Sequence, residues 1–139
     1  MSSKRILILN GPNLNLIGKR NPEVYGTETF EEYYVQLTSE FKGEELVYFQ
    51  SNVEGELINE IQEFDGEGII LNAGGFTHSS VAIRDAIEAV KTPVIEVHIS
   101  NITAREEFRH TSLISPVCEG CVFGFGLVSY RLALGYFLL

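Results

Sequence analysis

Hydrophobic and polar residues follow two alternating periods along the chain, and this pattern predicts five strands and four helices. Short runs of aliphatic and β-branched residues, typical of strands buried on both faces, are each followed by a stretch in which apolar residues recur every three or four positions. We expect strands over residues 5–9, 46–50, 68–71, 94–98 and 122–125. We expect helices over residues 30–42, 54–64, 80–90 and 128–138, with a short helical turn near 103–108.

Helix boundary signals support these elements. Three pairs have the S/T-x-x-E spacing of a capping box: Thr29 with Glu32, Ser51 with Glu54, and Thr103 with Glu106. Gly43 is expected to end the first helix, and Ser79 or Ser80 to cap the third. Pro93 excludes helix just before the fourth strand.

Strands and helices alternate throughout, which is the order of consecutive βαβ units. Because such crossovers are right-handed, helices then cover both faces of a parallel sheet. The sequence predicts an α/β fold with three layers, doubly wound and flavodoxin-like, whose five-stranded parallel sheet has the order 2-1-3-4-5. No repeat or linker interrupts the pattern, so we expect residues 1–139 to form a single domain.

Unusual polar residues gather just after the predicted strands. The segments concerned are 10–15 after the first strand, 50–52 after the second, 72–78 after the third and 98–101 after the fourth. Open α/β sheets bind ligands outside the carboxyl ends of their strands. We therefore expect these four segments to surround one site.

The stretch VIEVHISN, residues 94–101, places two polar side chains in an otherwise apolar strand. Glu96 and His98 lie two positions apart and point to the same face. From these residues alone they are a tolerated polar pair, half of a metal site, or an acid held by a carboxylate. The following backbone N–H groups and the Ser100 hydroxyl form a plausible cradle for a ligand carboxylate.

The first connection, NGPNLNLIGKRNPEVYGTET over residues 10–29, is far longer than the usual two to six residues. We expect a functional lid, with a variable surface loop as the alternative. An adjacent cation lowers the pKa of a tyrosine from its ordinary value of about 10. Tyr25, close to Lys19 and Arg20, is thus a candidate general base, and a packed tyrosine with one hydrogen bond is the alternative.

Two further segments supply candidate ligand contacts. In LNAGGFTHSS, residues 71–80, Asn72 and His78 are suited to a carboxylated or hydroxylated ligand, and no phosphate-binding fingerprint supports a nucleotide. Asp85 lies further along the following helix, where it could face a neighbouring subunit. Arg105 and Arg109 are spaced i, i+4 and share a face if their segment is helical, although an exposed helix face has the same pattern.

Composition restricts the cellular location expected for the protein and the kinds of partner that it could bind. No apolar run reaches the roughly 18 residues of a membrane span, and the N-terminus leads directly into a strand, so we expect a cytoplasmic protein without membrane contact. The net charge of −9 argues against nucleic acid, whereas an anionic small molecule fits if arginines gather locally. Cys118 and Cys121 lack the further ligands of a structural zinc site, so we expect no metal and interpret them as strand residues.

Four segments together resemble a known family, over residues 6 to about 136. They are NGPNLNLIGKRNPEVYG, QSNVEGELI, LNAGGFTHSSVAIRDAI and VIEVHISNITAREEFRHTS, and in this order they resemble type II 3-dehydroquinate dehydratase. The resemblance implies a lyase that converts 3-dehydroquinate to 3-dehydroshikimate by anti elimination through an enolate, without metal or organic cofactor. It also implies a role in the shikimate pathway or quinate metabolism, and a homododecamer built as a tetramer of trimers.

The resemblance implies chemical roles for five residues. Tyr25 corresponds to the base that removes the proton from C2, and Arg20 to the lid arginine that lowers the pKa of this base. Asn13 corresponds to the residue that holds a water against the enolate oxygen. His98 corresponds to the acid that protonates the departing C1 hydroxyl, and Glu96 to its supporting carboxylate.

The resemblance also implies how the substrate is bound. Asn72, Ile99 and Ser100 correspond to the carboxylate cradle, while His78 and Arg109 correspond to contacts with the ring hydroxyls.

Two more residues correspond to contacts around the site, and three depart from the family pattern. Asp85 corresponds to an acid that reaches the site from an adjacent subunit, and Arg105 to a second arginine near the tyrosine. The departures, none with an assigned chemical role, are Asn21, Val53 and Phe76. The alternative function is a non-catalytic, flavodoxin-like binding or assembly module, although the first strand ends without the acidic cluster of a phospho-acceptor or the Ser/Thr-rich grip for flavin mononucleotide.

Overall fold

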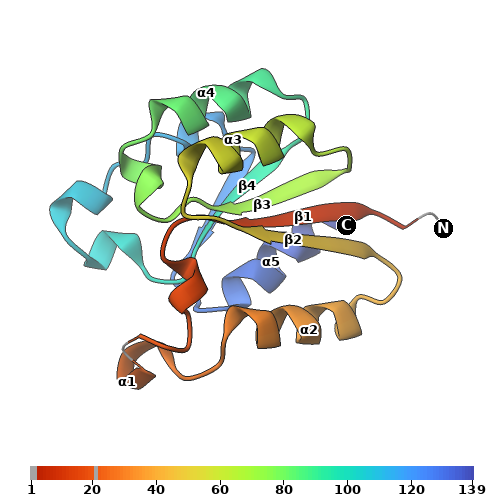
Figure 1. Cartoon of the computed structure of the whole chain (residues 1–139), viewed down its shortest axis with the longest axis horizontal. Helices are drawn as coiled ribbons and strands as arrows, with labels where there is room; N and C mark the ends of the chain where they lie inside the picture. Colours follow the sequence, from red (N-terminus) through yellow and green to blue (C-terminus); the bar gives the residue numbers. More distant parts are fainter. Residues whose placement is uncertain (1–2, 21) are drawn as a thin grey trace.

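A five-stranded parallel sheet forms the centre of the structure, a computed structural model that describes residues 3–20 and 22–139 (Figure 1). The strands are β1 (Arg5–Asn10), β2 (Glu45–Gln50), β3 (Gly68–Asn72), β4 (Val94–His98) and β5 (Gly120–Phe123). Their order is β2-β1-β3-β4-β5, and every pair is parallel. The predicted fold class and strand order are confirmed.

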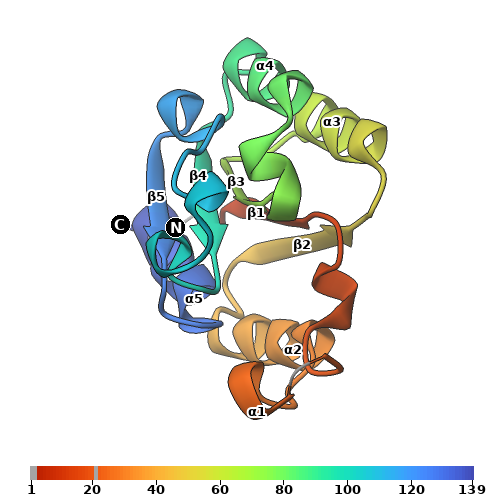
Figure 2. The ribbon, with the colours of Figure 1, turned by 90° about the vertical axis from the view of Figure 1, so that its left-hand side faces the viewer.

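Helices cover both faces of the sheet, which gives three layers (Figures 1 and 2). Those on one face are α2 (Phe30–Glu40) and α5 (Val128–Phe137), and those on the other are α3 (Glu54–Glu63) and α4 (Val81–Ala89). The remaining elements are short: α1 (Pro22–Tyr25), η1 (Leu14–Leu16), η2 (Gly74–His78), η3 (Ile102–Ala104), η4 (Glu107–Arg109) and η5 (Ser115–Val117).

Alternate residues of the central strands pack into two separate hydrophobic cores, one on each face of the sheet. In β1, Ile6 and Ile8 pack with α2 and α5, whereas Leu7 and Leu9 pack with α3 and α4. All four are fully buried, and burial of each aliphatic side chain is worth roughly 1.5–3 kcal/mol. The strand ends are thereby fixed in space, and so are the polar residues that follow them.

The predicted caps are partly right. Thr29 and Glu32 form the capping box of α2, with the Glu32 N–H 3.1 Å from the Thr29 hydroxyl, and Ser80 caps α4 by accepting from Ile83 N–H at 2.9 Å. The box of Ser51 with Glu54 is wrong, because α3 begins after Val53.

The second wrong box is that of Thr103 with Glu106. Asn101 caps η3 instead, since its carboxamide oxygen accepts from the Thr103 N–H at 3.2 Å. Gly43 does not end α2 either, because the helix already stops at Glu40 and is closed by Phe41.

Two elements near the carboxyl end of β4 differ from expectation. The last strand is shifted toward the N-terminus by two residues, because Gly124 and Gly126 adopt φ angles of 97° and 64° and turn the chain into α5. The turn expected near 103–108 is two 3-10 helices, η3 and η4, with Arg105 extended between them. Arg105 and Arg109 therefore share no α-helical face.

None of the helices in residues 3–20 and 22–139 combines the length and apolar character required to cross a membrane.

Candidate active site

A cleft of about 660 Å³ lies at the carboxyl ends of the strands. Figure 2 looks onto this edge, where the β1 connection, η2 and the segment after β4 converge. The residues predicted from the sequence that line the cleft are Asn13, Arg20, Asn72, His78, His98, Ile99, Ser100, Arg105 and Arg109. Segments far apart in the sequence thus form one site, as the strand order requires.

The carboxyl end of β4 holds a buried carboxylate and imidazole in direct contact. His98 Nε2 lies 2.5 Å from Glu96 Oε2, and the two residues are 5% and 1% exposed. Glu96 also accepts hydrogen bonds from the hydroxyls of Ser112 and Ser115 and a weak one from the Cys121 thiol at 3.5 Å. Burial on its own would raise the pKa of Glu96, but the hydrogen bonds from His98, Ser115 and Ser112 and the His98 charge together hold the pKa below its usual value.

These contacts determine which nitrogen of each histidine is available. An ionised Glu96 only accepts, so His98 carries a hydrogen on Nε2, and Nδ1 is the nitrogen left for proton exchange. The His78 ring stacks on that of His98 with centroids 6.4 Å apart. His78 Nδ1 lies 2.8 Å from the Thr111 carbonyl oxygen, which can only accept, so its Nε2 is the nitrogen free to accept from a ligand.

Asn72, at the end of β3, is oriented by buried groups. Its amide nitrogen donates to the Tyr130 hydroxyl at 2.9 Å, and its oxygen accepts from Gly74 N–H at 3.2 Å. The Tyr130 hydroxyl donates in turn to Asn10 Oδ1 at 2.8 Å. Burial raises the pKa of Tyr130 well above its usual value, so this hydroxyl stays neutral and links the ends of β1 and β3.

The β1 connection and η2 approach each other backbone to backbone. Gly11 N–H donates to the Asn72 carbonyl at 2.7 Å. A Cβ at Gly11 would lie 2.8 Å from the Ala73 carbonyl oxygen, and one at Gly74, where φ is +58°, would lie 2.9 Å from the Pro12 carbonyl oxygen. Only glycine permits this contact, which holds both segments at the edge of the cleft.

The first connection presents Asn13 and Arg20 to the cleft. Asn13 has a left-handed φ of 70°, and its N–H donates to Asn52 Oδ1 at 3.0 Å, which ties the connection to the segment after β2. The connection also contains η1 and α1, and α1 ends at Tyr25. The side chains of Tyr25 and Val24, like residue Asn21, lie outside the described part of the structure.

Three arginines make the cleft locally cationic in a chain with a net charge of −9: Arg20, Arg105 and Arg109. Arg105 Nη1 lies 3.4 Å from the Ser100 hydroxyl oxygen. Arg109 Nε donates to Glu106 at 3.2 Å, and its guanidinium lies 4.9 Å from the Phe108 ring centroid. The arrangement suits a small anionic ligand that also carries hydroxyl groups.

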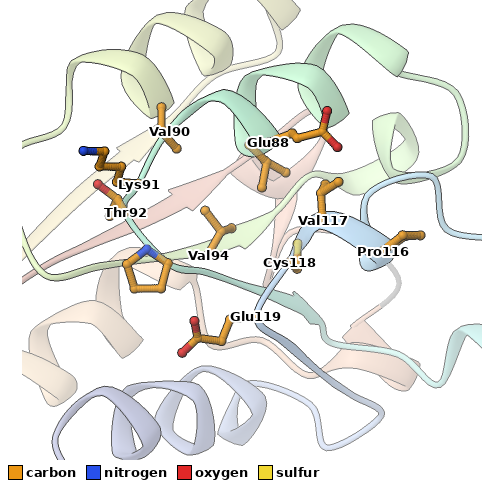
Figure 3. A pocket seen from close by; sticks show the side chains of 11 residues that line it. Glu88, Val90, Lys91, Thr92, Val94, Pro116, Val117, Cys118 and Glu119 are labelled. Atoms are coloured by element: carbon orange, nitrogen blue, oxygen red, sulfur yellow. The ribbon is translucent and has the colours of Figure 1, made fainter.

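Asp85 lies away from the cleft. Its side chain, on α4, is 64% exposed and pairs with Arg84 at 3.4 Å. A second hollow of about 380 Å³ lies at the amino end of β4 (Figure 3). Glu88, Lys91 and Glu119 border it, but no residue predicted for the site does.

The two cysteines are free thiols. Burial raises the pKa of Cys118 to about 12, which leaves it protonated and unreactive at neutral pH. Cys121 lies in β5, as expected, while Cys118 precedes the strand. Within residues 3–20 and 22–139, no cluster of three or more histidine, cysteine, aspartate or glutamate side chains is arranged to hold a metal ion.

Sequence reasoning missed the distant partners of the predicted residues. Ser112 and Ser115 contact Glu96, and Tyr130 contacts Asn72, yet all three lie far from these partners in the sequence. A serine pair spaced i, i+3 before Pro116 signals a turn, but the sequence does not indicate which carboxylate it meets.

Comparisons with known proteins agree on the family. The family model described as Dehydroquinase class II matches residues 4–138. A 3-dehydroquinate dehydratase of Exiguobacterium sp. is 54% identical over 132 residues, covering 94% of this chain and 91% of the relative. One of Bacillus licheniformis is 53% identical over 137 residues, covering 96% and 94%.

Solved structures are similar over almost the whole chain. The type II dehydroquinase of Butyrivibrio crossotus superposes with a TM-score of 0.91 at 44% identity, covering 99% of both chains. That of Propionibacterium acnes gives 0.90 at 38% identity, covering 97% of this chain and 96% of the other. The chain therefore belongs to the class II dehydroquinase family.

Proposed function

We propose that this protein is a 3-dehydroquinate dehydratase that converts 3-dehydroquinate to 3-dehydroshikimate by anti elimination of water. The observation that carries the proposal is the buried Glu96–His98 pair at the edge of a cationic cleft, in a chain of the dehydroquinase family. A non-catalytic binding or assembly module is not favoured, because binding alone requires no buried acid with an oriented proton.

In this mechanism, Tyr25 acts as the base and removes a proton from C2, next to the ketone, which gives an enolate. Arg20 stabilises the phenolate form of Tyr25, and Arg105 adds a second positive charge. Asn13 holds a water that donates to the enolate oxygen. As the enolate collapses, the C1–O bond breaks and His98 Nδ1 gives its proton to the departing hydroxyl, which leaves as water.

The binding contacts follow from the placement of the polar groups. The substrate carboxylate is bound by the backbone N–H groups and hydroxyl at Ile99 and Ser100, with Asn72 beside them. The ring hydroxyls form hydrogen bonds with His78 Nε2 and with the Arg109 guanidinium. No metal or organic cofactor takes part, because enolate formation next to a ketone and loss of a β-hydroxyl need only a base and an acid.

We infer further that residues 1–139 act as a single catalytic domain within a cytoplasmic homododecamer, a tetramer of trimers. Exposed Asp85 would then contribute to the site of an adjacent subunit.

The test is an absorbance assay. Purified protein freed of metal is mixed with 3-dehydroquinate, and formation of the conjugated enone is followed in the ultraviolet. We expect a steady rise, and borohydride added during turnover should trap no substrate on a lysine. Absence of the rise with folded, assembled protein would reject the dehydratase, and a trapped adduct would reject the enolate route.

A further inference from the structure

Besides the imidazole of His98, two hydroxyls and a thiol donate hydrogen bonds to the carboxylate of Glu96. Ser115 is the first residue of η5, and Ser112 lies just before this element. The segment follows β4 by more than ten residues and folds back over the end of that strand. Cys121, the register partner of Glu96 on β5, supplies the thiol. Neither serine lines the cleft of the candidate active site, so contact with a ligand does not account for their position.

We propose that Ser115, assisted by Ser112, is a positioning residue that disperses the negative charge of Glu96 and so lets His98 release its proton. The inference rests on the proposed function of His98 as the acid.

The physical reason lies in the state of the pair after proton transfer. Before transfer, the positive imidazolium compensates the Glu96 carboxylate. Afterwards a buried anion remains beside a neutral ring, and such an anion is costly unless hydrogen-bond donors surround it. Donors stabilise the more anionic state more strongly, so they lower the proton affinity of the pair as a whole. The lowered pKa of Glu96, to which both serines contribute, agrees with this effect.

The two serines are not equivalent. The Ser115 hydroxyl contacts Glu96 and the weakly donating Cys121 thiol. The Ser112 hydroxyl contacts both oxygens of Glu96 at 3.1 and 3.2 Å, but it also accepts from the N–H groups of Ile114 and Ser115. Substitution of Ser112 would therefore loosen the turn as well, and Ser115 gives the cleaner test.

Other charged or titratable groups face the pair from each neighbouring element. They are His78 on η2, Arg105 and Arg109 around η3 and η4, Cys118 before β5, and Cys121 on β5. All of them are retained when Ser115 alone is changed, so a shift in pH dependence reports on the lost hydroxyl.

The experiment compares pH profiles of kcat for the wild type, Ser115→Ala and Ser115→Thr. In Ser115→Ala, we expect kcat to fall about 10-fold with KM little changed, and the alkaline limb to move to higher pH by roughly one unit, the equivalent of one hydrogen bond to a charged group. Ser115→Thr keeps the hydroxyl and should restore both. If Ser115→Ala does not fold, Ser115→Cys retains a weak donor and should give a smaller shift in the same direction.

Ser80→Ala is the matched control. The Ser80 hydroxyl, which caps α4, also donates to a carboxylate, but that carboxylate is Glu54 on α3, at 2.5 Å, and not Glu96. We expect Ser80→Ala to lower stability and to leave the alkaline limb in place. An alkaline limb that stays in place in Ser115→Ala as well would overturn the proposal.

A readout independent of turnover separates this inference from the proposed function. Nitrogen-15 NMR of the His98 ring follows the titration of the Glu96–His98 pair without substrate. We expect this titration to move to higher pH in Ser115→Ala. A shifted titration in a protein that does not turn over 3-dehydroquinate would reject the proposed function alone, whereas an unshifted titration would reject the positioning role.

Discussion

The cleft is bordered by two regions with opposite construction, the carboxyl end of β4 and the connection from β1 to α2. Glu96 and His98 are almost fully buried and hydrogen-bonded to each other, and further groups of the same chain bind Glu96. In the connection, Arg20 is exposed and η1 contains no buried residue. If His98 is the acid, as we propose, the fold holds it in position before the substrate binds, whereas we expect the base to be completed when the connection closes over the substrate.

The largest effect should come from removing either reacting group. We expect His98→Ala and Tyr25→Phe each to lower kcat by roughly 10²–10⁴-fold, with the Kd of the product little changed. Steady-state assays with product titration by calorimetry measure both quantities. Near-normal turnover in His98→Ala would show that His98 is not the acid, and near-normal turnover in Tyr25→Phe would show that Tyr25 is not the base.

Arg20 tests the exposed region. Loss of its charge in Arg20→Ala should raise the pKa of Tyr25, and we expect the acidic limb of the kcat profile to move up by about 1–3 units. Arg20→Lys keeps the charge and is the matched control, with a smaller shift. An unmoved acidic limb in Arg20→Ala would mean that the connection does not tune the base.

A substitution at Tyr130 tests the buried hydrogen bonds that hold Asn10 and Asn72. Tyr130→Phe leaves Asn10 Oδ1 and the Asn72 amide without their partner, and we expect a loss of about 1–3 kcal/mol in the free energy of unfolding, with a raised KM. Tyr136→Phe, on the same helix but 47% exposed, should lose less than about 0.5 kcal/mol. Chemical denaturation compares the two variants, and equal losses would contradict the role of the buried link.

The smallest effect is expected when Glu96 is replaced, and it is a change in how the free energy of unfolding depends on pH. Its pKa is lowered on folding, so its contribution is present above the unfolded pKa of about 4.3 and is lost as the pH falls through the lower folded value. Glu96→Gln removes this term, and its stability should decline less steeply below pH 5 than that of the wild type. Denaturation midpoints at several pH values measure the slopes, and equal slopes would mean that Glu96 is not stabilised as an anion.

The two regions also differ in how far the sequence predicts them. Apolar runs and crossover rules predicted the sheet order, and the same-face spacing of Glu96 and His98 pointed to their contact. Periodicity could not supply the distant partners, because Ser115 and Tyr130 reach the site only through the tertiary fold. The S/T-x-x-E spacing also predicted the wrong partner at the start of α3, because another local arrangement forms there. The Ser51 hydroxyl donates to the Glu56 carboxylate and accepts from the Val53 N–H, instead of forming a capping box with Glu54.

We propose that an acid at the end of β4 and a base on the connection act on opposite faces of one substrate. The decisive experiment uses 3-dehydroquinate that carries deuterium at only one of its two C2 positions. Mass spectrometry of the product then shows which hydrogen is lost. We expect loss of the hydrogen on the face opposite the C1 hydroxyl and retention of the other. Loss of the hydrogen on the same face as the hydroxyl would mean that the base and the acid act from one side of the substrate.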